Sequence, residues 1–153
     1  MKTFKNIFLF VAICSFTSFA CKKHCHDDCV KTKKGLRITG KQEVPPKETD
    51  AHGTADVSYD KCTKILTYTV SWTNLTGVPT GAHMHGTAPR GVNAGIKHDF
   101  FALIPKAISG TFSNSVNVDG IAIKEDSLLL GYYYFNFHTP KFPGGEIRGQ
   151  IEF

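Results

Sequence analysis

Apolar and polar residues alternate most regularly over residues 65–73, and this alternation predicts a β-strand. One face carries Leu66, Tyr68, Val70 and Trp72, and the other carries Thr67, Thr69, Ser71 and Thr73. Successive side chains of a strand point to opposite faces, so the first set is expected in a core and the second at the surface. Trp72 is the expected anchor of this core, because one buried indole removes more apolar area from water than any other side chain here.

Shorter runs of the same kind occur along the rest of the chain and are separated by turn residues. They predict strands over 35–44, 54–59, 82–86, 96–103, 109–118, 134–138 and 146–153. Seven or eight short strands in one chain predict an all-β protein built as an antiparallel β-sandwich. The sequence contains no internal repeat and no Gly-rich loop with phosphate-binding spacing.

The last two runs flank a Pro/Gly-rich loop at residues 141–145. In the first run Phe135 and Phe137 share one face, whereas Asn136 and His138 share the other. In the second run one face carries the apolar residues Ile147, Ile151 and Phe153. The other face carries the polar residues Glu146, Arg148 and Gln150. Because Pro cannot continue a strand ladder and Gly permits positive φ, the two runs are predicted to form a hairpin-like end of a β-domain.

A His-x-His pair, His83 and His85, lies within the short run over 82–86. Residues two apart on a strand project from the same face about 6.5 to 7 Å apart, so both imidazoles can reach one small metal ion. If the two ends of the domain meet, His138 joins them, with Asn136, Glu146 and Arg148 beside the cluster. Further ligands are available in principle, although nothing local fixes their position: His52, His98 and Asp99.

The first twenty residues have the features of an export signal peptide. Lys2 and Lys5 precede an apolar run over 7–16, and small residues Ser18 and Ala20 occupy the cleavage positions. The run is shorter than the roughly 20 residues that a membrane-spanning helix requires.

Cys21 follows the signal directly, which resembles a lipoprotein signal in which the thiol is acylated. The sequence departs from the usual pattern at Ser18 and Phe19, where a Leu and a small residue are expected. We therefore expect export to a bacterial cell envelope and a lipid anchor on Cys21 that holds the protein at a membrane. Ordinary cleavage at the same bond, giving a secreted or periplasmic soluble protein, is the alternative.

Residues 21–34 are charged and nearly free of apolar side chains, so a flexible tether is expected there, followed by one domain over 35–153. The tether contains residue types that can bind a metal ion, but not at the spacing of a zinc knuckle: His24, Cys25, His26 and Cys29. Cys25 and Cys29 can pair with each other, or either can pair with Cys62.

The chain has 153 residues and a formal net charge of +5, which is a mild excess of basic residues. Its basic residues form no run interleaved with exposed aromatic residues. Nucleic acid is therefore not an expected partner.

Several of these segments together resemble the CHRD domain, a family named after chordin and found in many secreted bacterial proteins. The resemblance rests on 39–46 with its Val-Pro-Pro ending, Gly53, the 82–86 strand with the loop after it, His138-Thr139, and the segment 143–151. The resemblance implies a short helix near 123–131, where Glu125 and Asp126 suit a helix start. The sandwich predicted from the strand count is expected to be immunoglobulin-like or copper-zinc superoxide dismutase-like. The dismutases also have a His-x-His strand, but the sequence lacks the fuller ligand set of those enzymes.

Three hypotheses for function follow, in order of preference. The first is a non-catalytic extracytoplasmic binding or structural module whose protein or glycan partner is unknown. The second is a protein that binds copper or zinc through His83, His85 and His138. The third is a redox metalloenzyme, which ranks last because no nucleophile with a local base and no carboxylate pair can be located.

Overall fold

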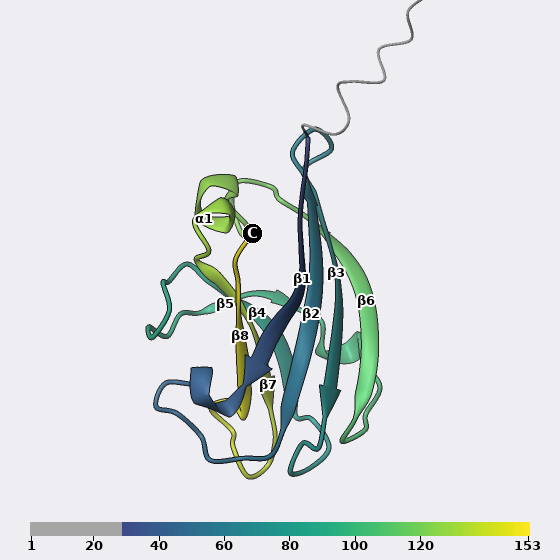
Figure 1. Ribbon diagram of the computed structural model, residues 1–153, viewed down its shortest axis with the longest axis vertical. Helices are drawn as coiled ribbons and strands as arrows, with labels where there is room; N and C mark the ends of the chain where they lie inside the picture. Colours follow the sequence, from purple (N-terminus) through teal and green to yellow (C-terminus); the bar gives the residue numbers. More distant parts are fainter. Residues whose placement is uncertain (1–28) are drawn as a thin grey trace, which may run out of the picture.

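The computed structural model of the protein describes residues 29–153. Within this part the chain forms strands, one short α-helix and two 3-10 turns (Figure 1). In chain order they are β1 (Val30–Thr39), η1 (Gly40–Gln42), β2 (His52–Asp60), β3 (Ile65–Thr73), β4 (Gly81–Gly86), β5 (Ile96–Asp99), η2 (Phe101–Leu103), β6 (Gly110–Asn117), α1 (Glu125–Leu129), β7 (Tyr133–His138) and β8 (Ile147–Ile151).

The strands form one antiparallel sheet in the order β5-β4-β7-β8-β1-β2-β3-β6. Its two halves, β5-β4-β7-β8 and β1-β2-β3-β6, meet at the β1–β8 junction, which pairs Thr39 with Arg148. The sheet curls around this junction, so that its halves face each other across a common core (Figure 1). The prediction of an all-β, antiparallel sandwich-like fold is confirmed.

Aromatic side chains from the two halves fill the core. Trp72 on β3 packs against Phe137 on β7, and Tyr68 on β3 packs against Phe135 on β7, each pair with ring centroids 5.1 Å apart. Trp72 is 1% exposed, and its indole N–H donates a hydrogen bond to the carbonyl of Ala107 at 3.0 Å. The indole thus buries its apolar surface while its polar atom keeps a partner, as predicted for the core anchor.

Strand boundaries agree with the sequence prediction for β3 and nearly so for β2, β4, β6, β7 and β8. The strand predicted over 96–103 is wrong in its second half, because the chain turns into η2 there. The Asp99 carboxylate accepts the Phe101 backbone N–H at 2.8 Å, which closes a turn in place of a ladder. The helix expected near 123–131 is confirmed as α1.

The tether predicted through residue 34 is wrong for its last residues, since β1 begins at Val30. Residues 31–35 leave their side chains exposed, so hydrophobic patterning carries no sign of a strand there. Backbone pairing with β2 extends to Val30 opposite Asp60. A disulfide between Cys29 and Cys62 joins the same end and selects one of the pairings left open by the sequence.

The expected signal peptide over 1–20 and the expected acylation site Cys21 lie outside the described residues. So does Cys25, the third of the cysteines considered for pairing. Within 29–153, no helix has the length and apolar character needed to cross a membrane.

Replacing Trp72 by Ala is expected to lower the free energy of unfolding by about 3 to 5 kcal/mol, because it removes a large buried side chain and leaves a cavity. Urea denaturation followed by circular dichroism measures the change. Thr73→Ala, at an exposed position of the same strand, is the matched control and should change stability by about 1 kcal/mol or less. Equal effects of the two substitutions would contradict the assignment of Trp72 as the anchor.

Candidate metal centre

The polar face of the β4-β7-β8 half is buried beneath loops rather than open to solvent. Asn136, Arg148 and Gln150 are all buried, although their strands bury an apolar face on the other side as well. Two segments carry the covering contacts. Glu43, after η1, contacts Asn136, and the 87–95 loop after β4 contacts Arg148 and Gln150.

Three histidines meet on this face. His83 and His85 project from β4, and His138 lies at the end of β7 opposite Gly81. A side chain at position 81 would stand 2.8 Å from the His83 ring and 3.2 Å from the His138 ring, so glycine there lets the two imidazoles approach. One ligand nitrogen from each of the three rings lies within 4.8 Å of the others. The convergence expected from the sequence therefore occurs.

Backbone carbonyls hold two of the imidazoles in a defined orientation. His138 Nδ1 lies 2.9 Å from the Pro143 carbonyl, and His85 Nδ1 lies 2.9 Å from the Ala94 carbonyl. A carbonyl only accepts, so both Nδ1 atoms carry the proton and both Nε2 atoms present a lone pair. The Nε2 atom of His85 is buried and has no hydrogen-bond partner. It is thus a free ligand atom inside the cluster.

His83 completes the group through a hydrogen bond with His138. Its Nδ1 lies 3.2 Å from His138 Nε2, and its Nε2 lies 3.8 Å from Asp99 Oδ1. Because His138 Nε2 has no proton, His83 donates in the metal-free protein. The 3.2 Å separation is close to the roughly 3.3 Å between two nitrogens bound tetrahedrally to one zinc ion. A proton shift to Nε2, toward Asp99, would free the His83 Nδ1 lone pair as well, so that each of the three rings offers an unprotonated nitrogen.

Burial also favours the uncharged form of two of the three rings. It lowers the pKa of both His83 and His85 from the ordinary value, and a positive charge on the neighbouring His138 would lower each further. The Asp99 carboxylate partly opposes this for His83, and the hydrogen bond to Ala94 does so for His85. The neutral imidazole is the form that binds metal ions.

Other candidate ligands do not join the cluster. His98 bonds to the Tyr68 hydroxyl at 3.0 Å, and His52 bonds to the Asp50 carbonyl. Asp99 lies beside His83, but its side chain is 63% exposed. A second group of metal-capable types, formed by Cys29, Asp60 and Cys62, has both sulfurs in the disulfide and offers no thiolate.

Glu146 and Arg148 were expected beside the histidine cluster, but each of them bonds to other residues. The buried Glu146 carboxylate accepts hydrogen bonds from the hydroxyls of Thr49, Thr76 and Thr139 at 2.7 to 2.9 Å. Arg148 donates instead to the Val92 carbonyl at 3.1 Å. Arg148 and Glu146 therefore form no ion pair with each other, and the guanidinium bonds to a loop carbonyl instead.

Sequence reasoning missed Glu43, which lies over Asn136. The carboxyl is 3% exposed, one of its oxygens has no partner, and the other accepts a long hydrogen bond of 3.5 Å from the Asn136 amide. Burial raises its pKa to about 7, against the opposing charges of Arg148 and Lys47. The segment 39–46, with an acidic residue before Val44-Pro45-Pro46, is part of the CHRD resemblance, but its pattern indicated a strand end and not a buried carboxyl.

Comparison with known families matches residues 36–151 to the model of the CHRD domain. No curated protein matches the chain. No solved structure matches it either.

Glu43 is expected to make the free energy of unfolding depend on pH. Its carboxyl has a pKa of about 7 in the folded protein and about 4.5 when unfolded, so the folded state holds the proton more tightly. Stability should therefore fall, by on the order of 3 kcal/mol, as pH rises from 4.5 through 7, and level off above that. Glu43→Gln stays neutral and should lack this decline.

Urea denaturation of the metal-free wild type and of Glu43→Gln across this pH range tests the expectation. The difference between the two curves isolates Glu43 from other titrating groups. Curves that run parallel from pH 4.5 to 8 would contradict it.

Proposed function

This chain belongs to the CHRD domain family, and we propose that it is an exported, non-catalytic β-domain that binds one copper or zinc ion. The ligands are His83, His85 and His138. The observation that carries the proposal is the convergence of three imidazole nitrogens within 4.8 Å. Carbonyl groups on the far side of two of the rings support it, because metal-binding histidines commonly donate their other N–H to such acceptors.

The donor set favours these metals over others. Imidazole nitrogen suits zinc and copper, whereas magnesium and calcium take oxygen ligands. Three protein ligands leave the fourth position for another group, while Asp99 lies beside His83 Nε2, the ring nitrogen that does not face His138. The proposed activity is binding. Redox turnover remains the third hypothesis, because the described residues near the cluster offer no second set of ligands.

Export is the second part of the proposal. It is supported by the signal-like first twenty residues, by Cys21 and by the disulfide between Cys29 and Cys62. Disulfides persist in oxidising compartments such as the cell envelope. The described domain begins eight residues after Cys21. A lipid on that cysteine would tether the domain to a membrane through the end of β1 that carries the Cys29–Cys62 disulfide.

Metal analysis of the purified protein tests the binding site. Every sample carries His24→Ser, Cys25→Ser and His26→Ser and no affinity tag, because these residue types and tags bind metals on their own. After loading with zinc or copper and removal of free ions, the protein should retain about one ion per chain by elemental mass spectrometry. His83→Ala and His138→Ala should each lose it, since two ligands remain.

His52→Ala is the matched control, because His52 is exposed and lies outside the cluster. It should retain the ion. A folded protein that takes up neither zinc nor copper would refute the metal proposal. The cluster would then be a hydrogen-bonded structural tie, and the ligand would be sought among proteins and glycans.

The lipid anchor has its own test. Cys21→Ser in the full chain should move the protein from the membrane fraction to the soluble fraction and abolish incorporation of a labelled fatty acid. Cys25→Ser is the control and should leave both unchanged. A wild-type protein that incorporates no fatty acid would show ordinary cleavage instead.

A further inference from the structure

A stack of three planar groups links the Arg148 side chain to the histidine cluster. The Arg148 guanidinium lies 3.5 Å from the centre of the Tyr134 ring. The Tyr134 ring in turn stacks on His85, with centroids 5.0 Å apart and planes 5° from parallel. Pressed between two groups in this way, the Tyr134 ring sets the plane of the His85 imidazole.

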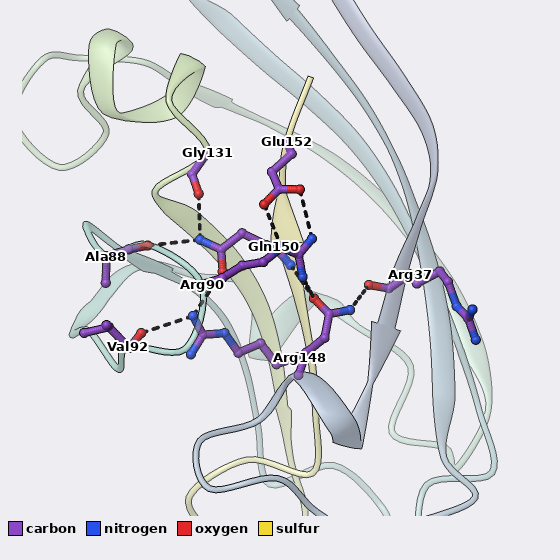
Figure 2. A network of polar contacts seen from close by, with 9 residues as sticks. Arg37, Ala88, Arg90, Val92, Gly131, Arg148, Gln150 and Glu152 are labelled. Atoms are coloured by element: carbon purple, nitrogen blue, oxygen red, sulfur yellow. Dashed lines mark hydrogen bonds and ion pairs between the residues drawn. The ribbon is translucent and has the colours of Figure 1, made fainter.

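Arg148 and Gln150 also hold the 87–95 loop against β8 (Figure 2). Arg148 Nη2 donates to the Val92 carbonyl at 3.1 Å, and Gln150 Nε2 donates to the Ala88 carbonyl at 3.0 Å. The two side chains bond to each other, since Gln150 Oε1 accepts from Arg148 Nη2 at 3.0 Å. The loop is thereby fixed at two points along its length.

The same loop carries the carbonyl that orients His85. Ala94 accepts from His85 Nδ1 at 2.9 Å, and its own N–H donates to the Tyr134 hydroxyl at 3.0 Å. A displaced loop would therefore remove the acceptor that keeps the proton on Nδ1. Without that acceptor, His85 could place its proton on Nε2, the buried atom that is left without a hydrogen-bond partner.

Arg148 is an unusual residue to bury for packing alone. It is 1% exposed, and among the residues that the structure describes no carboxylate lies within ion-pair distance, 4.0 Å, of its nitrogens. Burying a guanidinium without a paired carboxylate carries a large desolvation cost. Hydrogen bonds to Val92, Asn93 and Gln150, the Tyr134 ring and the more distant charge of Glu43 offset that cost. The contacts to the loop and to the ring lead to His85.

We propose that Arg148 and Gln150 are positioning residues for the metal site, which hold the 87–95 loop and the Tyr134 ring so that His85 presents Nε2. This inference rests on the proposed metal-binding function. Replacing a residue that orients a metal ligand without itself binding the metal typically weakens metal affinity 10- to 100-fold. We call Arg148, Gln150 and Tyr134 together the clamp. It connects the polar face of β8 to His85, which lies more than sixty residues earlier in the chain than Arg148.

Two variants test the clamp. Arg148→Met keeps much of the side-chain volume but removes every donor, and should weaken zinc binding about 10- to 100-fold. Tyr134→Phe keeps the ring on His85 but removes the acceptor for Ala94, and should weaken binding less. Arg37→Met is the matched control, because the Arg37 side chain is exposed on β1 and points away from the network (Figure 2).

Zinc dissociation constants come from competition with a chromophoric chelator, and the His85 tautomer in the metal-free protein comes from nitrogen NMR of the imidazole. The wild type and Arg37→Met should show Nδ1–H alone, and the two clamp variants should show a mixture. Variants with zinc affinity within twofold of the wild type and an unchanged His85 tautomer would overturn the inference.

If Arg148→Met does not fold, Tyr134→Phe decides the matter by the same two measurements. Wild-type protein that binds no zinc or copper refutes the proposed function. The clamp is then judged by the His85 tautomer alone, which needs no metal.

Discussion

The fold depends on the aromatic contact between β3 and β7. The two halves of the sheet are joined by the narrow β1–β8 junction, so packing across the core must hold them face to face. Trp72 against Phe137 and Tyr68 against Phe135 provide that packing. Because side chains alternate along a strand, turning Phe135 and Phe137 inward forces Asn136 and His138 outward. The core thus decides which face of β7 carries the polar residues.

The polar face of β7 and β8 forms a site because loops cover it. A polar face in solvent needs no particular geometry, since water satisfies any group it presents. Under the loops each group needs a protein partner, and this requirement fixes Arg148 to Val92, Gln150 to Ala88 and His85 to Ala94. The Nε2 of His85 has no partner in that setting, and the same is true of Glu43 Oε1 and Asn136 Oδ1. Buried unsatisfied atoms of this kind are the places where a ligand is expected.

Much of this was accessible from the sequence, and the remainder was not for physical reasons. Period-two alternation assigned the inner and outer faces of β3, β7 and β8, and the His-x-His spacing placed His83 and His85 together. Alternation cannot show that an outer face is covered, because an antiparallel strand with one solvated face has the same pattern. Pairing along 30–34 depends on backbone groups and Cys29–Cys62 on a long-range contact, so neither was visible locally.

The hydrogen bond between His83 and His138 reconciles a structural role for the cluster with the proposed metal site. In the metal-free protein one proton lies between two nitrogens 3.2 Å apart. An ion that binds both nitrogens takes the place of that proton at a similar separation, while Pro143 and Ala94 keep the other two rings in position. The core side chains of β4 and β7, Ala82, Met84, Phe135 and Phe137, lie on the strand faces opposite the three histidines. In the proposed site, metal binding would therefore release a proton while the rings keep the positions that the carbonyls and the strands already give them.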